Sequence, residues 1–273
     1  MSFFSEFPKV VHDVAGSKRL LTNILRRIGI KRTFKENAGF FIDYTVKNSD
    51  TPEIIADKLY DAPTRHWLPI LANDIIDPQF DWVQDQSMHE KLVSEKYPGR
   101  AIFPLIDFVS PAFFSALDFA IGDGVVIVRG DNVIATGQVH AWNKSLFKLE
   151  VTGISQTLSL LVGSDKVYEE DPLNAGQALL DGPNFVVGRD IAINAESLHH
   201  FEDDDGRTVD AWRNDPLIDT SPLIKAYIDE KKSIETIITN RIFEDNINED
   251  KRSIRLIRNE FVDNIEQGLE SQF

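Results

Sequence analysis

The stretch DTPEIIADKLYDAPTRHWLPILAND, residues 50–74, decides the fold of the N-terminal part of this chain, because it contains the start and end signals of two short helices. Asp50 or Thr51 can cap the first helix by accepting hydrogen bonds from its free N–H groups, and Pro52 suits a first helical turn. Apolar residues then recur at helical spacing as far as Tyr60. A tight corner and a second helix are expected to follow.

Strands are predicted on both sides of this helix pair. Residues 40–46, FFIDYTV, alternate in the manner of a strand. The second helix buries Trp67, and residues 75–82, IIDPQFDW, then turn back towards a returning strand. Asp77–Pro78 breaks the chain before that strand, and Trp82 is available to lie over the sheet edge. The predicted order is strand, helix, helix, strand.

Charge is divided unevenly along the 273 residues, whose formal net charge is −15. Residues 1–35 carry eight Lys and Arg but only two acidic residues, so the acidic excess lies in the rest of the chain. A general nucleic-acid-binding function is excluded, because neutralising phosphates requires a surplus of basic residues. A basic arm on an acidic body indicates docking onto an acidic surface, and two unrelated solvated faces are an equally open alternative.

The arm has an apolar stripe at helical spacing. Residues 17–30, SKRLLTNILRRIGI, are predicted as a helix that Ser17 begins and Gly29 ends, with an extended segment as the competing interpretation. The stripe is expected to meet either the body of the protein or a partner. The predicted contact residues are Ile24, Leu25, Arg26, Arg27 and Ile28.

Neither export nor membrane insertion is predicted. The chain has no cysteine, which rules out disulfides and thiol chemistry. Its first residues, MSFFSEFPKVVHD, do not have the regions of a secretion signal. The most apolar run, residues 103–122, contains two Asp and two Pro residues. Each Asp costs about 2.5–3.5 kcal/mol on insertion, so a soluble protein made in a cytoplasm is expected.

From about residue 95 the pattern changes to short strands. Residues 125–153 alternate between apolar and polar positions and contain turn signals, which predicts that residues 120–170 form a small antiparallel barrel or sandwich. Residues 171–190 are rich in Pro, Gly and Asn and are expected to form a loop. Residues 197–212 are expected to form a hairpin that turns at Asp205–Gly206. Helical spacing returns later, with a last helix at 259–270.

No catalytic motif is found. GDG at 122–124 precedes a strand and is a turn, and in SLFK at 145–148 the Ser and Lys of an alternating strand would face opposite ways. His199 and His200 lie near the acidic run EDDD, but neighbours on a strand should not converge on one metal ion. A solvated acidic turn is preferred. No enzyme activity, metal site or cofactor is expected.

Longer motifs resemble a known family. The stretch YTVKNSDTPEIIADKL is similar to the opening of a LysM module, in which a Tyr-x-Val strand leads to an Asp-Thr helix start. With LLTNILRRIGI, HWLPILANDIIDPQFDW and the late TNRIFEDNINEDKRSIRLIRNEFV, it resembles the LysM-like baseplate wedge protein of T-even-like contractile-tailed bacteriophages. The resemblance covers residues 20–82 well and 197–265 more loosely.

Together with the strand periodicity, the resemblance implies an α+β fold: a small LysM-like βααβ core, an antiparallel β-barrel or sandwich insertion, and C-terminal helices. The expected domains are a basic N-terminal arm (1–35), a LysM-like domain (36–94), a β-rich insertion (95–196) and a C-terminal hairpin and helical region (197–273). The implied core and loop residues are Tyr44, Asp50, Thr51, Ile55, Tyr60, Trp67, Asn73, Asp77, Pro78 and Trp82.

The implied function is structural. Such a protein is a virion component of the tail baseplate, assembled in the host cytoplasm, that bridges neighbouring wedges and clamps the wedge core to tail-proximal proteins. The implied partners are the wedge core bundle, the sheath-initiating, lysozyme-like wedge protein and neighbouring wedge copies, with no nucleic acid, membrane or sugar. Arg255, Ile257 and Phe261 complete the expected contact residues.

Sugar binding is the alternative, because LysM modules bind N-acetylglucosamine polymers through two loops. Carried over, these loops contain Ser49 to Thr51 and Asn73 to Ile76. A peptidoglycan-binding protein of a lysis or cell-wall system is therefore the second hypothesis. Three positions depart from the family: Asp61 stands for a common Gly, Pro69 for an apolar helix former, and Gln79–Phe80 for two aromatic residues. The local geometry at these positions stays open.

Overall fold

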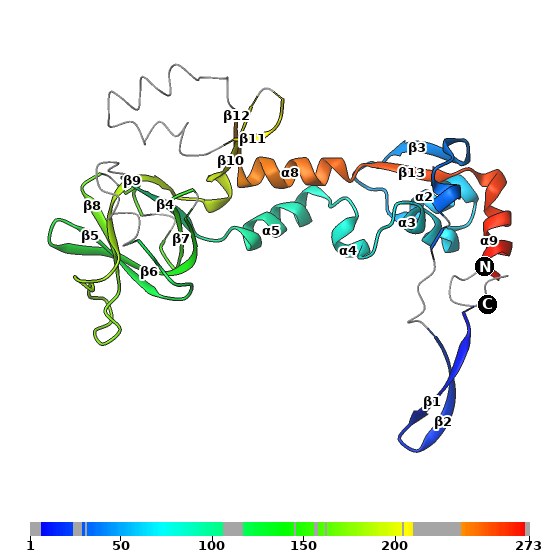
Figure 1. The fold of residues 1–273 in the computed structure, drawn as a ribbon, viewed down its shortest axis with the longest axis horizontal. Helices are drawn as coiled ribbons and strands as arrows, with labels where there is room; N and C mark the ends of the chain where they lie inside the picture. The colour runs from blue at the N-terminus through cyan, green and yellow to red at the C-terminus, as the bar shows by residue number, and fades with distance from the viewer. Residues whose placement is uncertain are drawn as a thin grey trace. The chain divides into compact units, whose positions relative to one another are not determined.

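The computed structural model describes residues 7–23, 29–30, 32–105, 117–144, 146–155, 158–161, 163–203, 205–209 and 236–270. The chain forms two compact units, whose helices and strands are drawn in Figure 1. The first unit combines Met1–His89 with Asn246–Phe273, and the second is Glu90–Asp245. The second unit is therefore inserted between the two parts of the first. The presence of helices and strands confirms the α+β class.

The first unit is built on an antiparallel strand pair whose members come from opposite ends of the chain. β3 (Phe41–Thr45) pairs with β13 (Ser253–Ile257). Between them in the chain come α2 (Pro52–Tyr60), η2 (Pro63–Arg65) and α3 (Trp67–Ala72). The returning strand expected after Asp77–Pro78 is wrong, because α4 (Pro78–Asp81) follows there. Asp77 caps α4, and Pro78 suits its first turn, so the expected breaker starts a helix.

The helix signals within residues 50–74 act as expected. Thr51, and not Asp50, is the N-cap of α2, and its side chain accepts a hydrogen bond from the Ile54 N–H at 3.3 Å. Asp61 ends the helix in the left-handed conformation, with φ 49° and ψ 29°. Glycine adopts this conformation with less strain, and Asp tolerates it. Asp61 thus forms the corner after α2, at a position where the sequence left the local geometry open.

Two apolar clusters stabilise the first unit, and both depend on its C-terminal part. η6 (Asn259–Phe261) and α9 (Val262–Glu270) follow β13. The larger cluster contains the buried residues Phe41, Ala56, Tyr60, Trp67, Leu68, Ala72, Ile257 and Val262. The smaller cluster contains Val46, Ile55, Trp82, Val83, Ile254 and Leu256. Each cluster therefore needs side chains from both ends of the chain.

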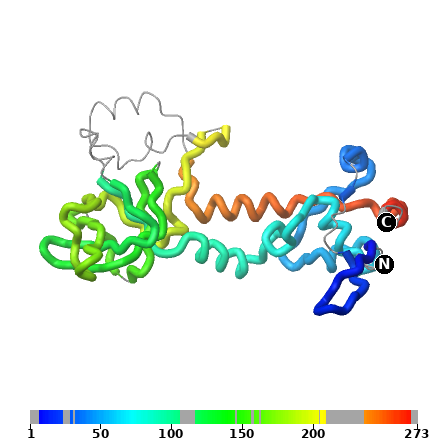
Figure 2. The backbone as a smooth tube through the Cα atoms, turned by 60° about the horizontal axis from the view of Figure 1, so that its bottom comes forward, coloured from blue at the N-terminus to red at the C-terminus, as the bar shows by residue number. Residues whose placement is uncertain are grey.

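The N-terminal arm begins with a hairpin. β1 (Lys9–Val14) and β2 (Ser17–Thr22) pair antiparallel as a two-stranded ribbon, drawn in blue in Figure 2. The helix predicted from residue 17 is wrong over β2, and the extended interpretation is confirmed there. The turn residues Ala15 and Gly16 have φ values of 53° and 82°. Two consecutive positive values match the turn that a two-residue hairpin requires. α1 (Arg32–Lys35) and η1 (Ala38–Phe40) then lead into β3.

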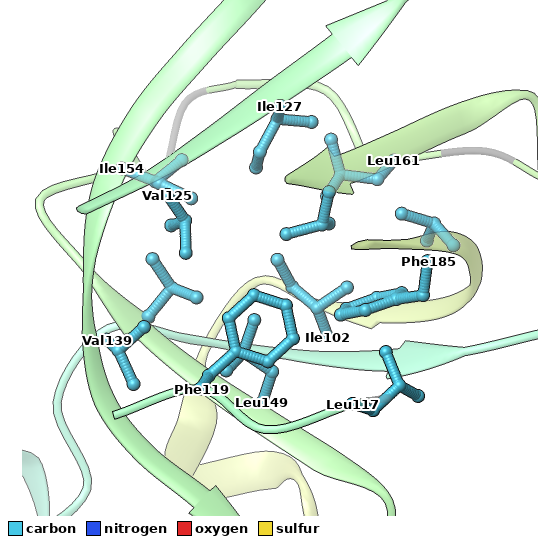
Figure 3. Close-up of a cluster of buried hydrophobic side chains, with 13 residues drawn as sticks. Ile102, Leu117, Phe119, Val125, Ile127, Val139, Leu149, Ile154, Leu161 and Phe185 are labelled. Atoms are coloured by element: carbon cyan, nitrogen blue, oxygen red, sulfur yellow. The ribbon is translucent and has the colours of Figure 1, made fainter. Parts of the chain in front are cut away.

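The second unit contains a closed antiparallel barrel in the order β4-β7-β6-β5-β8-β9. Its strands are β4 (Arg100–Pro104), β5 (Gly124–Arg129), β6 (Asn132–Asn143), β7 (Lys148–Thr152), β8 (Asp165–Glu169) and β9 (Asn184–Ile191). Apolar side chains, including Ile102, Phe119 and Phe185, fill its interior (Figure 3). Closure leaves these strands without open sheet edges. β9 occupies part of residues 171–190, which were expected to be a loop.

The remaining elements of the second unit include a small sheet and η3 (Asn194–Glu196). β10 (Leu198–Glu202) pairs with β11 (Thr208–Val209) and with β12 (Thr236–Thr239). The predicted turn at Asp205–Gly206 is confirmed, since the Gly206 N–H donates to the Asp203 carbonyl at 2.9 Å. Within the described ranges, none of the helices has the length and apolar character needed to cross a membrane.

Two helices contain the boundaries between the units. α5 (Gln86–Lys96) includes the boundary after His89, and α8 (Asn240–Asp250) includes the boundary before Asn246. Residues 197–273, expected as one C-terminal region, are thus divided between the two units. Residues 36–94, expected as one domain, lie mostly in the first unit together with the far end of the chain.

Candidate interaction surfaces

Asp50 organises the turn between β3 and α2. Its side chain is 1% exposed, and its carboxylate accepts hydrogen bonds from the Tyr44 hydroxyl (2.6 Å), the Lys47 N–H (3.1 Å) and Lys58 Nζ (2.6 Å). The Trp82 indole N–H donates to the Asp50 carbonyl at 3.1 Å. Three donors compensate the buried charge. Asp50 therefore holds the turn in place and is occupied by groups of the chain itself.

The titration of Asp50 predicts acid sensitivity. Burial alone raises its pKa, but the hydrogen bonds from Lys58, Tyr44 and the Lys47 amide outweigh burial and lower the pKa to about 2, from an ordinary 3.8. Because the folded-state pKa lies below the unfolded one, this stabilisation is complete above the unfolded value and is lost as the pH falls from about 4 to about 2.

We expect Asp50→Asn to lower the free energy of unfolding at pH 7 by about 1–2 kcal/mol, a figure reduced because Lys58 is solvent-screened. Urea unfolding at several pH values measures the effect. The difference between variant and parent should shrink from pH 4 towards pH 2. A difference that stays constant over this range would contradict the assigned role of the Asp50 charge.

Asn73 closes the second loop onto β13. Its Nδ2 donates to the Arg255 carbonyl at 2.9 Å, and its Oδ1 accepts from the Arg255 N–H at 2.8 Å. One side-chain amide thus makes the two hydrogen bonds that a further strand would make at this residue. Asp50, Thr51 and Asn73, which the LysM resemblance placed in two expected sugar loops, all make hydrogen bonds within the chain.

The loop after Asn73 presents two apolar side chains. Asp81 Oδ2 accepts from the N–H groups of Ile76 (3.0 Å) and Asp77 (2.9 Å), and Lys251 Nζ donates to the Phe80 carbonyl at 2.7 Å. On this fixed corner Ile76 is 79% exposed and Phe80 is 53% exposed. Large apolar side chains held in solvent by an ordered loop are typical of an interaction surface.

The expected C-terminal contact residues have different environments. Ile257 is fully buried in the larger cluster, so its expected contact role is corrected: it stabilises the unit and is not presented to a partner. Phe261 is half-buried, and its ring meets Phe40 edge-on with centroids 4.7 Å apart. Arg255 is exposed and lies over the Phe41 ring, 4.9 Å from its centroid. The expected arm contacts at 24–28 lie outside the described residues.

The other expected core and loop residues keep structural roles. Ile55, Tyr60, Trp67 and Trp82 are buried, while Asp77 and Pro78 begin α4. The Tyr60 hydroxyl donates to the Ile257 carbonyl at 2.9 Å, and burial raises the pKa of Tyr60. These contacts join the first helix to the C-terminal strand.

The hairpin is the surface that sequence reasoning missed. Val11 and Leu20 lie opposite each other and are 67% and 63% exposed, and Val10 lies opposite Leu21. Among the described residues, β1 and β2 pair only with each other. A two-stranded hairpin is at best marginally stable alone in water. The β-branched valines in KVVHDV, residues 9–14, followed by Gly16, were the signal that could have revealed it.

His199 and His200 contact each other, which corrects the expectation that they face apart. A register shift between Leu198 and His200 places their Nδ1 atoms 2.7 Å apart, and His200 Nε2 lies 2.9 Å from Glu202 Oε1. His199 stacks on Phe243, and burial, with the neighbouring His200, lowers its pKa. Across the part of the chain that the structure describes, no three His, Asp or Glu side chains are placed to hold a metal ion.

The N-terminal part of the chain is similar in sequence to known proteins. Residues 8–99 match the family described as base plate wedge protein 53. The chain is also similar to baseplate wedge protein gp53 of Enterobacteria phage T4, with 32% identity over 79 residues, or 28% of this chain. It spans 39% of the length of that curated relative. Both likenesses are to phage baseplate wedge proteins and lie in the N-terminal part of the chain.

The sequence match to the wedge family covers the N-terminal surfaces described above and ends where the barrel begins. It includes the hairpin, the Asp50 turn, the Asn73 loop and the corner that presents Ile76 and Phe80. β4 begins at Arg100, directly after the matched range. β13, which completes the first unit, also lies outside the match.

Proposed function

We propose that this chain is a structural, non-catalytic subunit of the baseplate wedge of a contractile phage tail. The observation that carries the proposal is the wedge match of residues 8–99, a segment in which ordered loops present apolar side chains to solvent. We further propose that the first unit is LysM-like. Its β3, α2 and α3 follow one another as in the βααβ order, and β13, which pairs with β3, supplies the last strand after the inserted unit.

The proposed role is to bridge neighbouring wedges and to clamp the wedge core to the tail-proximal proteins. Its partners would be the wedge core bundle, the sheath-initiating, lysozyme-like wedge protein and neighbouring copies, in a baseplate assembled in the host cytoplasm. The internal hydrogen bonds of Asp50, Thr51 and Asn73 favour protein contacts over a sugar site. The separation of a basic arm from an acidic body favours electrostatic docking during assembly.

Tagged capture from producing cells tests this function. Recovery in a fixed ratio with several tail-sized structural proteins is expected. Recovery alone, with the purified protein pelleting on insoluble peptidoglycan, would instead support a cell-wall-binding LysM protein and overturn the wedge proposal.

The arm supplies a sharper prediction. Reversing two charges with Arg26→Glu and Arg27→Glu should lower incorporation into tail particles about tenfold or more, because docking loses two attractive charges and gains two repulsive ones. The melting temperature should stay unchanged. Lys91→Glu with Lys166→Glu is the matched control, because it changes the net charge equally at exposed positions outside the arm. Normal incorporation of the arm variant would contradict arm docking.

A further inference from the structure

The hairpin combines exposed aliphatic side chains with positive charge. The pair Val11 and Leu20 and the pair Val10 and Leu21 lie on opposite faces of the ribbon, because directly opposed residues of an antiparallel pair share a face and successive pairs alternate. Lys9, Lys18 and Arg19 add basic groups, and all three are exposed. The carboxylate of Asp13 accepts from the Gly16 N–H at 2.7 Å and so serves the turn.

One end of the barrel has the opposite charge. Between Val167 and Gly188 the chain has four acidic residues and no Lys or Arg. Two leucines of the β8–β9 loop protrude into solvent, Leu173 at 89% and Leu180 at 76% exposure. The barrel therefore presents aliphatic side chains within a negatively charged loop.

This loop is ordered by its own hydrogen bonds. Asp171 accepts from the Leu173 N–H at 2.8 Å and from Asn174 Nδ2 at 2.7 Å, and these hydrogen bonds lower its pKa. The Leu179 N–H donates to the Glu169 carbonyl at 2.8 Å. A preformed surface loses less conformational entropy on binding than a flexible one.

A third apolar side chain lies at the same end of the barrel. Ile121 is 78% exposed in the turn before β5, and the Glu170 N–H donates to the Gly124 carbonyl at 2.8 Å. β5 and β8 run antiparallel, with Val125 opposite Glu169. The β5–β6 turn, and Val133 near the start of β6, are therefore at the other end of the barrel.

We propose that the hairpin of one copy docks onto the β8–β9 loop of a second copy. The two surfaces are opposite in charge, and each exposes aliphatic side chains. Every copy of the chain carries both surfaces. The resulting contact is head-to-tail, and such contacts produce rings when the rotation closes. The inference rests on the proposed function, in which neighbouring wedges carry copies of the same chain.

Cross-linking between copies tests the contact without ambiguity, because the chain has no cysteine of its own. One copy carries Leu20→Cys and a second, differently tagged copy carries Leu180→Cys. The full-length proteins are mixed at low ionic strength and oxidised mildly. We expect the covalent heterodimer in about tenfold or greater excess over the pair Leu20→Cys and Val133→Cys, which places the second thiol at the opposite barrel end.

Equal yields for the two pairs would overturn the inference. A chain that carries both Leu20→Cys and Leu180→Cys gives a second readout. If it closes on itself without forming covalent dimers, the hairpin binds its own barrel and the second-copy contact is wrong.

Charge exchange supplies the independent test. With the thiols in place, Lys18→Glu and Arg19→Glu in one copy, or Glu169→Lys and Asp181→Lys in the other, should each reduce the cross-link about tenfold. Combining both pairs should restore it. If the cross-link does not return, the two surfaces do not attract each other through opposite charges. If copies with Leu20→Cys and Leu180→Cys but no charge reversal fail to cross-link while the protein enters particles normally, this inference alone is overturned. Absence of the protein from particles overturns the proposed function.

Discussion

Arg100→Leu is expected to lower the free energy of unfolding of the second unit by about 3–5 kcal/mol, the usual cost of breaking a buried ion pair from one side. The side chains of Arg100 and Asp190 are 2% and 0% exposed, and Nε lies 3.0 Å from Oδ1. Without the guanidinium, the Asp190 carboxylate would keep the hydrogen bond from the Leu161 N–H at 2.8 Å but lose its counter-ion.

The pH dependence of this variant has a defined sign. Burial already raises the pKa of Asp190, and losing Arg100 raises it further, since the nearby positive charge lowers it. A carboxyl whose pKa is raised by folding destabilises the fold more as the pH rises through the unfolded value. The deficit of Arg100→Leu should therefore shrink as the pH falls towards 4.

Chemical denaturation, followed through a spectroscopic signal of the barrel, measures the change in the free energy of unfolding. An exposed ion pair is the control. Arg32 and Glu36 are 91% and 60% exposed, so Arg32→Leu should change stability by only about 0–0.5 kcal/mol. Adding Asp190→Leu to Arg100→Leu should recover part of the loss, because it removes the unpaired charge. Equal effects at Arg100 and Arg32 would show that the buried pair has no special role.

Features that depend on neighbours in the sequence could be predicted. A cap at Asp50 or Thr51 and the proline start of α2 need only adjacent residues, and the structure assigns the cap to Thr51. The turn at Asp205–Gly206 is of the same kind. Such signals are independent of the rest of the fold, and this is why residues 50–74 were interpretable.

The arm shows where periodicity is ambiguous. Leu20 and Leu21 fit an apolar helix face when residues 17–30 are considered alone. They fit a strand once Val10 and Val11 are placed opposite them. β-Branched residues favour strands, and a hairpin needs both strands to be recognised together. The segment considered for the helix began at Ser17, so it excluded β1, the strand that pairs with β2.

Features that join distant residues could not be predicted. Asn73 was expected in a loop, but its partner Arg255 is 182 residues away in the chain. Asp50 was expected as a cap or loop residue, yet its hydrogen bonds fix a turn whose backbone also contacts Trp82. No local pattern identifies which strand completes a sheet, so the return of the chain was placed at 75–82 and not at β13.

Ending the chain at Asp245 is expected to abolish the fold of the first unit while the barrel remains folded. The truncation removes β13, η6 and α9. β3 then loses its strand partner, and the larger cluster loses the fully buried Ile257 and Val262. A domain of this size has only a few kcal/mol of stability, about 5–15, and large core residues contribute about 2–5 kcal/mol each.

Amide hydrogen exchange measures the outcome segment by segment. Protection should disappear from α2 and α3 in the truncated chain and persist in β5 and β8, since the barrel is closed by strands of residues 100–191. Ile257→Ala in the full chain is the graded control, with an expected loss of about 2–5 kcal/mol confined to the first unit. Protection of α2 and α3 without residues 246–273 would contradict the two-ended fold.

The complementary variant removes the insertion and keeps both ends. Asn248 Oδ1 accepts from the Gln84 N–H at 2.8 Å, and its Nδ2 donates to the Gln84 carbonyl at 3.2 Å, so the chain leaves and re-enters the first unit at adjacent points. A linker of about four to six residues between Asp85 and Asn248 can therefore span the gap. This shortened chain should fold cooperatively and protect α2 and α3, although it lacks the barrel. If it unfolds while the full chain is stable, the first unit depends on the inserted residues, and its completion by β13 alone is insufficient.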